Sequence, residues 1–323
     1  MKHTKLLSIL SALILIFQMS ACSVIFPDIG YGKLTTTFDN DLDIVENNTY
    51  YYQPNDAVYL LEDKFIYTDL DESDNNTWGT PRKLMICDLK TGEITVPITK
   101  PMGDINNLYY LNGKLYFTAY ANTATDWGFC LFSYDLANNE LETIYETPNT
   151  SGYPIIPFIL SDTLYYFANA KTQTEINNET NYTTNLGYKL HKYDGYADSI
   201  ISEDIPFKFD FLDSFDNNGV FIQDYESGKY YQIKYDGAIV ETNEKTAKKA
   251  DKTLPETNTE INDLLISGRF GDYYILEDKI PPNENEDEED ACGYKYTINY
   301  YLYDTNNKET YELTNATYWY YYI

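Results

Sequence analysis

The chain has 323 residues, of which 51 are acidic and 23 basic, so its formal net charge is −28 at pH 7. A surface of this charge repels nucleic acid and anionic lipid headgroups, which excludes both as partners held by electrostatic attraction. Because the whole chain contains two histidines, a histidine-rich metal centre is excluded as well.

The N-terminal segment MKHTKLLSILSALILIFQMSACSVIF has the features of an export signal. Two lysines precede an apolar run over 6–17 that is too short to span a bilayer as a mature helix, and small residues follow. The sequence MSAC resembles the lipobox of bacterial lipoproteins, with Met19 in place of the more usual leucine. This resemblance implies cleavage before Cys22 and lipidation of that cysteine. The alternative is an ordinary secretory signal whose cysteine is incidental.

We therefore predict a signal peptide over 1–21, a short membrane tether over 22–30 and a single domain over 31–323. No second apolar run of spanning length follows the signal, so the lipid on Cys22 is the expected membrane attachment. Removing the two lysines of the signal changes the net charge from −28 to −30. The expected location is the outer face of the bacterial cytoplasmic membrane.

A short motif recurs five times in the remaining chain. In each copy an alternating apolar or aromatic run ends at an aspartate, usually after a tyrosine, and a turn-rich tetrapeptide and a second apolar run follow. The five aspartates are Asp88, Asp135, Asp194, Asp236 and Asp304. A carboxylate at the start of a turn can accept backbone hydrogen bonds, so each motif predicts a hairpin capped by its aspartate.

A second hairpin is predicted upstream of each aspartate. The runs at 57–67, 108–117 and 158–167 alternate around short turns, and 108–117 contains the Asn-Gly pair typical of tight hairpins. Looser versions precede the last two aspartates. Each unit therefore contains four short strands with an apolar period of two, and repetition of such units predicts a β-propeller.

The segments 66–69 (IYTD) and 116–119 (YFTA) are imperfect copies of a Tyr-Trp-Thr-Asp motif. On these residues the chain resembles the YWTD-type propellers of low-density-lipoprotein-receptor-like proteins, and it also resembles Tyr-rich propeller lipoproteins of Gram-positive bacteria. The YWTD resemblance implies six blades. We predict an all-β, six-bladed propeller of four-stranded antiparallel blades, closed by pairing the final run ATYWYYYI with strands that precede the first unit. A seven-bladed ring is the alternative.

Long connections are expected on one face of this propeller. The links between second and third strands fall at about 70–82, 120–127, 169–186 and 277–293, whereas the other hairpin turns are tight. Binding residues concentrate on loops that a rigid scaffold carries. The long-loop face is therefore predicted to recognise a protein, a peptide or a glycan.

Two tryptophans are candidates for this recognition. Trp78 and Trp127 each lie late in one of the long connections and precede a glycine. Exposed aromatic rings would form a platform for a glycan or a peptide. The alternative is that both fill one repeated packing position, because the pairs at 186–187 and 292–293 stand at corresponding places.

Asp69, Asp71 and Asp74 are candidates for calcium binding, because they place hard oxygen ligands close together. The segment lacks the glycine and distal glutamate of an EF-hand loop, so a solvated acidic loop is the alternative. We predict no other cofactor.

Catalysis has little support in the sequence. His191 is the single histidine after Cys22 and lies in a predicted strand, where a structural role is expected, and no nucleophile turn is recognisable. Cys87 and Cys130 are expected to be buried free thiols, and with Cys292 they make an odd number, which excludes a complete disulfide framework. The preferred interpretation is a non-enzymatic binding or assembly platform. Its rival is a surface glycan-processing hydrolase that uses paired carboxylates near the central channel.

Overall fold

The computed structural model describes residues 33–44, 58–72, 79–122, 127–147, 155–160, 163–169, 188–205, 214–216, 219–243, 264–281 and 293–321. Within these ranges the regular structure is entirely β-strand. No helix in the described ranges has the length and apolarity that crossing a membrane requires. The predicted signal peptide, the tether and Cys22 lie outside the described residues.

The described chain forms 20 strands in five consecutive units of four. Unit one contains β1 (Tyr59–Leu60), β2 (Lys64–Leu70), β3 (Pro81–Asp88) and β4 (Ile94–Thr95). Unit two contains β5 (Met102–Leu111), β6 (Lys114–Asn122), β7 (Trp127–Asp135) and β8 (Glu140–Glu146). Unit three contains β9 (Ile156–Leu160), β10 (Thr163–Asn169), β11 (Tyr188–Tyr193) and β12 (Asp198–Ile205).

Unit four contains β13 (Ser214–Asp216), β14 (Gly219–Gln223), β15 (Tyr230–Ile233) and β16 (Ile239–Thr242). Unit five contains β17 (Leu265–Phe270), β18 (Tyr273–Ile280), β19 (Gly293–Asp304) and β20 (Glu309–Tyr321). Within every unit each strand pairs antiparallel with the next, and a short β3–β5 pairing joins units one and two into one sheet. The prediction of an all-β fold built from four-stranded antiparallel sheets is confirmed.

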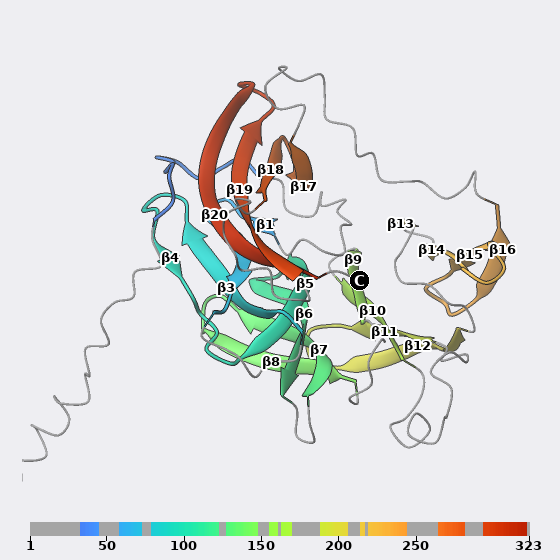
Figure 1. Cartoon of the computed structure of the whole chain (residues 1–323). Helices are drawn as coiled ribbons and strands as arrows, with labels where there is room; N and C mark the ends of the chain where they lie inside the picture. Colours follow the sequence, from blue (N-terminus) through green and yellow to red (C-terminus); the bar gives the residue numbers. More distant parts are fainter. Residues whose placement is uncertain are drawn as a thin grey trace, which may run out of the picture.

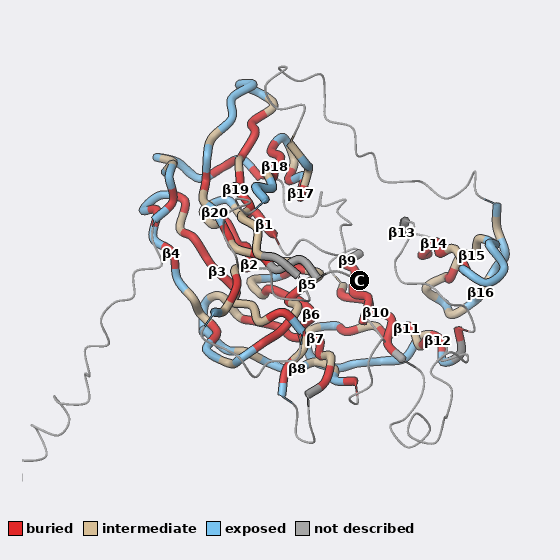
Figure 2. The backbone as a smooth tube through the Cα atoms, viewed as in Figure 1, coloured by how far each residue is buried: buried red, intermediate tan, exposed pale blue. Residues whose placement is uncertain are grey.

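Unit one packs against units two and five, unit two against unit three, and unit three against unit four through their apolar faces. In Figure 1 they follow one another around a common middle, with the first strand of each unit innermost and the fourth outermost. Figure 2 shows buried residues along the inner strands and exposed residues at the periphery. Every described interface carries an aromatic pair: Phe65–Tyr300 between units one and five, Tyr59–Tyr110 between one and two, Tyr116–Tyr193 between two and three, and Tyr165–Tyr235 between three and four.

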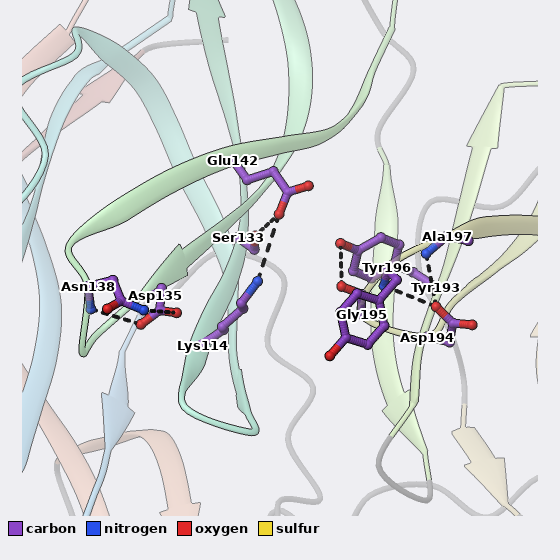
Figure 3. Close-up of polar contacts among 10 residues, drawn as sticks. All are labelled: Lys114, Ser133, Asp135, Asn138, Glu142, Tyr193, Asp194, Gly195, Tyr196 and Ala197. Carbon is purple, nitrogen blue, oxygen red and sulfur yellow. Dashed lines mark hydrogen bonds and ion pairs between the residues drawn. The ribbon is translucent and has the colours of Figure 1, made fainter.

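The recurring aspartates cap the turns between third and fourth strands, as predicted. Asp135 accepts hydrogen bonds from the backbone N–H groups of Ala137 and Asn138 at 2.9 and 3.0 Å. Asp194 accepts the corresponding hydrogen bonds from the backbone N–H groups of Tyr196 and Ala197. Figure 3 shows that both carboxylates turn back onto their own turns. Equivalent bonds are accepted by Asp88, Asp236 and Asp304. The motif is therefore a repeated structural device.

Closure of a six-bladed ring is not seen among the described residues, and the C-terminal run differs from the prediction. It does not form a separate closing strand, because β20 is continuous from Glu309 to Tyr321 and pairs along its length with β19. A local hairpin satisfies these backbone groups at a smaller cost in chain entropy than a distant partner would. Residues 45–57, which include part of the predicted N-terminal partner, lie outside the described ranges.

The turn aspartates make acid stability testable. Backbone hydrogen bonds hold the pKa of Asp88, Asp135 and Asp194 below the ordinary value of 3.8. A carboxyl whose pKa is lower in the folded state stabilises the fold above its unfolded pKa and loses this effect as the pH falls. We expect the triple variant D88N/D135N/D194N to show a smaller drop in melting temperature between pH 5 and pH 3 than the parent.

The control is the triple variant E140Q/E203Q/E312Q, which removes the same number of exposed negative charges outside these turns. Calorimetric melting at each pH checks the expectation. Equal pH dependence in both triple variants would contradict a special contribution from the turn aspartates.

Candidate functional site

The two faces of the assembly differ in their connections. One face, here called the short-turn face, carries the tight turns 61–63, 89–93, 112–113, 136–139, 194–197, 234–238, 271–272 and 305–308. The opposite face, here called the long-loop face, carries the second-to-third strand connections 71–80, 123–126, 170–187, 224–229 and 281–292. Three of these connections, 71–80, 170–187 and 281–292, are long, as predicted, whereas 123–126 is as short as turns of the other face.

A polar group of described residues lies on the long-loop face where units five, one and two meet. We call Asp69, Arg82, Asp104 and Tyr318 the seam cluster. Strand β2 ends at this face, β3 and β5 begin there, and β20 ends there, so the four side chains come from three different units. The contacts among these strands bring together residues that are up to 249 positions apart in the chain.

Arg82 is the cation of the seam cluster. Its guanidinium carbon lies 3.7 Å from the centre of the Tyr318 ring, and Nη1 donates to the carbonyl oxygen of Thr317 at 3.4 Å. Burial raises the pKa of Tyr318 to about 12 even though the neighbouring Arg82 charge acts to lower it. The tyrosine therefore remains a neutral hydroxyl, and it shares hydrogen bonds of 3.0 and 2.9 Å with the hydroxyl groups of Thr68 and Tyr300.

Asp69 joins unit one to unit five. Its Oδ1 accepts hydrogen bonds from the backbone N–H groups of Thr317 and Leu70 at 2.7 and 2.8 Å. Burial nevertheless raises the pKa of Asp69, because desolvation of the charged form outweighs these bonds and the charge of Arg82. The carboxylate therefore holds together two units, at an electrostatic cost.

Asp104 has a comparable position in unit two. It accepts a hydrogen bond from the Thr80 N–H at 3.0 Å, and burial raises its pKa while Arg82 acts to lower it. Its φ of 44° is in the left-handed region, which aspartate tolerates better than most residues. Gly79 must lack a side chain, because a Cβ atom would lie 2.1 Å from Asp104 Oδ2.

Two of the three predicted calcium ligands make other contacts in the described structure. Asp69 accepts the two backbone bonds above, Asp71 forms an ion pair of 2.9 Å with Lys83, and Asp74 lies outside the described residues. The part of the chain that the structure describes contains no group of three or more His, Cys, Asp or Glu residues able to hold a metal ion. Calcium binding stays a prediction.

The predicted aromatic platform falls mostly outside the described ranges. Trp127 is the first residue of β7 and pairs with Asn122, at the long-loop end of unit two. Trp78 lies in the undescribed part of the connection between β2 and β3, close to the seam cluster in sequence. Ligand binding by the two tryptophans stays a prediction.

The sequence also predicts buried free thiols. Cys87 and Cys130 are buried free thiols, as expected, and burial raises the pKa of both, to about 12 for Cys130. Cys292 lies outside the described residues. These thiols are therefore protonated at neutral pH.

His191 packs at the interface of units two and three. Its Nδ1 lies 2.8 Å from Asp198 Oδ2, and its ring stacks on Tyr166 with centroids 4.6 Å apart. Tyr145 of unit two contacts the same ring edge-on at 5.3 Å. This enclosure supports the structural role that its position in a strand predicted.

Arg82 and Asp104 carry no sequence signal that marks them as site residues. Neither belongs to a recognisable motif, and an arginine at the start of a strand gives no sign of the tyrosine it will stack on. One sequence feature near the site is Gly79, because a glycine before a strand can mark a place where the backbone comes close to another residue.

No family model matches this chain, and no curated protein matches it. Similar solved structures include a nidogen–laminin complex, with 10% identity, 82% of each chain covered and a TM-score of 0.37. An oligogalacturonate lyase from Vibrio parahaemolyticus has 15% identity, covers 81% of this chain and 66% of its own, and has a TM-score of 0.32. A GH43_1 enzyme from Xanthomonas citri complexed with xylotriose has 10% identity, covers 83% and 87%, and has a TM-score of 0.31.

These structures have propeller folds. At such identities the likeness concerns the fold alone, and the three proteins differ in what they do. These similarities therefore assign neither a binding role nor a catalytic role to this chain.

Asp69 allows a test of the seam between units one and five. Replacement by alanine removes the acceptor of two backbone N–H groups and should lower the free energy of unfolding by about 1–3 kcal/mol. Replacement by asparagine keeps an acceptor and removes a charge that is costly to bury. Because the folded-state pKa is raised, the stabilisation linked to the protonated carboxyl is lost as the pH rises.

We therefore expect the melting temperature of D69N to rise relative to the parent between pH 4 and pH 7. Denaturation of D69A, D69N and the exposed control E62A at both pH values checks this. E62A should change the free energy of unfolding by no more than about 0.5 kcal/mol. A pH-independent difference between D69N and the parent would contradict the buried, desolvated carboxylate.

Arg82 tests the stacking contact independently. R82K keeps the charge but loses the planar stack on Tyr318, which should cost about 0.5–1 kcal/mol. R82M also leaves two partly buried carboxyl groups without their neighbouring cation, so its loss should be larger, about 2–4 kcal/mol. Chemical denaturation measures both, with K308M, at an exposed lysine of the short-turn face, as the control. Equal losses for R82K and R82M would show that the charge contributes nothing.

Proposed function

We propose that the protein is a membrane-anchored extracytoplasmic platform that binds a protein, a peptide or a glycan through its long-loop face. The observation that carries this proposal is the difference between the two faces. The turns between third and fourth strands are closed by their own aspartates, whereas the connections 170–187 and 281–292 leave from the opposite face. A rigid scaffold with its variable connections on one face is the usual arrangement of a recognition surface.

The proposed anchor is a lipid on Cys22 after removal of residues 1–21, with 22–30 as the tether, on the outer face of the cytoplasmic membrane. Its support is the export signal and the lipobox-like MSAC segment. We further propose that residues 31–323 form one six-bladed ring. The packing order supports a ring, because unit five lies against unit one, as the aromatic contact Phe65–Tyr300 records.

A glycan-processing hydrolase is the second candidate. Burial raises the pKa of both Asp69 and Asp104, and a raised pKa is what a general acid needs. Each of these carboxyl groups, however, already accepts a hydrogen bond from the backbone. Their role in joining units favours the binding function over catalysis.

The binding function can be tested with the two tryptophans and a matched aromatic control. The chain from residue 23 is applied to an array of bacterial cell-wall glycans and to a peptide library, and the strongest probe is then titrated against W78A, W127A and Y196A. Tyr196 is 97% exposed but lies on the short-turn face. Loss of a central aromatic contact should weaken binding about tenfold or more, whereas Y196A should bind like the parent.

The melting temperature of each variant separates recognition from packing. Weaker binding with unchanged melting supports a platform on the long-loop face. A large drop in melting shows instead that the tryptophans fill a repeated packing position. Release of reducing ends from the glycan probes, lost in D69N and D104N, would support the hydrolase in place of the binding platform.

A further inference from the structure

The first described segment, residues 33–44, is fixed to the short-turn face. Its backbone N–H groups donate to carbonyl oxygens in the turns of unit one: Leu34 to Gly92 at 2.9 Å, Phe38 to Leu89 at 2.8 Å and Leu42 to Glu62 at 2.7 Å. Thr35 donates to Leu313 of β20 in unit five at 2.7 Å. The segment therefore crosses from one unit to the other along their short turns.

Side chains strengthen this attachment. Leu34, Leu42 and Ile44 are buried in the main apolar cluster, which contains residues of units one, two and five. Phe38 packs edge-on against Tyr311 with ring centroids 5.2 Å apart, and Asp41 forms an ion pair of 2.7 Å with Lys90 in the turn after β3. Segment 33–44 is thus part of the folded domain, and the chain enters the domain at the short-turn face.

The anchor and this entry point are close in sequence. Cys22 precedes Lys33 by 11 residues, and a chain of that length reaches at most about 40 Å. The two faces are separated by the length of the strands, roughly 25–30 Å for strands such as β3 and β7. A tether that joins the domain at one face therefore brings that face closer to the membrane than the other.

We infer that the anchored protein stands with its short-turn face toward the membrane and its long-loop face toward the exterior. This inference rests on the proposed lipid anchor at Cys22. It narrows the partner of the proposed binding function to a macromolecule reached from outside, such as a glycan or protein of the cell envelope, and excludes the lipid surface that carries the anchor.

The charge of the short-turn face agrees with a tether as the means of attachment. The five capping aspartates lie there, together with acidic residues of the other turns, Glu62, Asp63 and Asp272. These carboxylates are repelled by anionic headgroups. The face is therefore directed to the membrane by where the chain enters the domain and is not adsorbed on the lipid.

Two asparagines of unit two make a matched pair of reporters. Asn122 ends β6 at the long-loop face, and Asn138 lies in the turn after β7 on the short-turn face. Both are exposed. N122C and N138C, each labelled with a donor dye, differ mainly in which end of the same sheet carries the label. Cys87 and Cys130 are buried and should not react.

The native lipoprotein is reconstituted in neutral phosphatidylcholine vesicles that contain an acceptor dye on a headgroup. Because the strands separate the two reporters by roughly 25–30 Å, energy transfer should be at least about twofold greater from position 138 than from position 122. Cys292 is replaced by serine in all variants. Equal transfer, or greater transfer from position 122, would overturn the inference.

A second arm separates orientation from lipidation. The chain from residue 23, with a histidine tag at its N-terminus, is held on vesicles by a nickel-chelating lipid, so that tethering does not depend on modification of Cys22. The ratio between positions 138 and 122 should again be at least about twofold. If this arm gives the expected ratio but the native chain fails to float with vesicles, the lipid anchor is wrong, and with it both the proposed membrane location and the inferred orientation.

The double variant F38A/L42A tests whether the docking of segment 33–44 sets the orientation. Loosening that segment lengthens the tether, so the transfer ratio should fall toward one. The melting temperature of the remaining domain is monitored in parallel. An unchanged ratio in a variant whose segment 33–44 has become sensitive to protease would overturn the inference.

Discussion

Face-to-face packing between successive four-stranded units is the interaction on which the rest of the structure depends. A single small sheet has two faces and cannot bury either alone, so each unit needs its neighbours. Aromatic side chains make these contacts, from Phe65 against Tyr300 to Tyr165 against Tyr235. The contact between the first and last units brings distant parts of the chain together and creates the surroundings of the seam cluster.

The two ends of every sheet carry different kinds of connection. Strand alternation places tight turns on one end, where a carboxylate such as Asp135 satisfies the amides of its own turn without help from the rest of the protein. The other end carries the connections between second and third strands, three of which are long. Stabilising contacts nevertheless lie at both ends, because the seam cluster joins units at the long-loop end.

The seam cluster shows that contacts in the tertiary structure determine the role of a residue. Asp69 belongs to an acidic segment that suggests calcium, yet its carboxylate accepts the Thr317 amide of unit five. Arg82 belongs to no motif, yet it stacks on Tyr318 and balances two partly buried carboxyl groups. An acidic run in a chain with 51 acids is therefore poor grounds for a metal site unless the ligands are shown to converge.

The sequence by itself determined the local structure: four-stranded units, their hairpins and the capping role of aspartates such as Asp194. These features depend on side-chain alternation and turn chemistry, which act over a few residues. Tertiary structure decided that β20 continues its local hairpin, that segment 33–44 docks on the short turns, and that Arg82 and Asp104 meet Asp69. Such contacts join residues far apart in the chain, and their energies depend on burial and geometry that no local pattern contains.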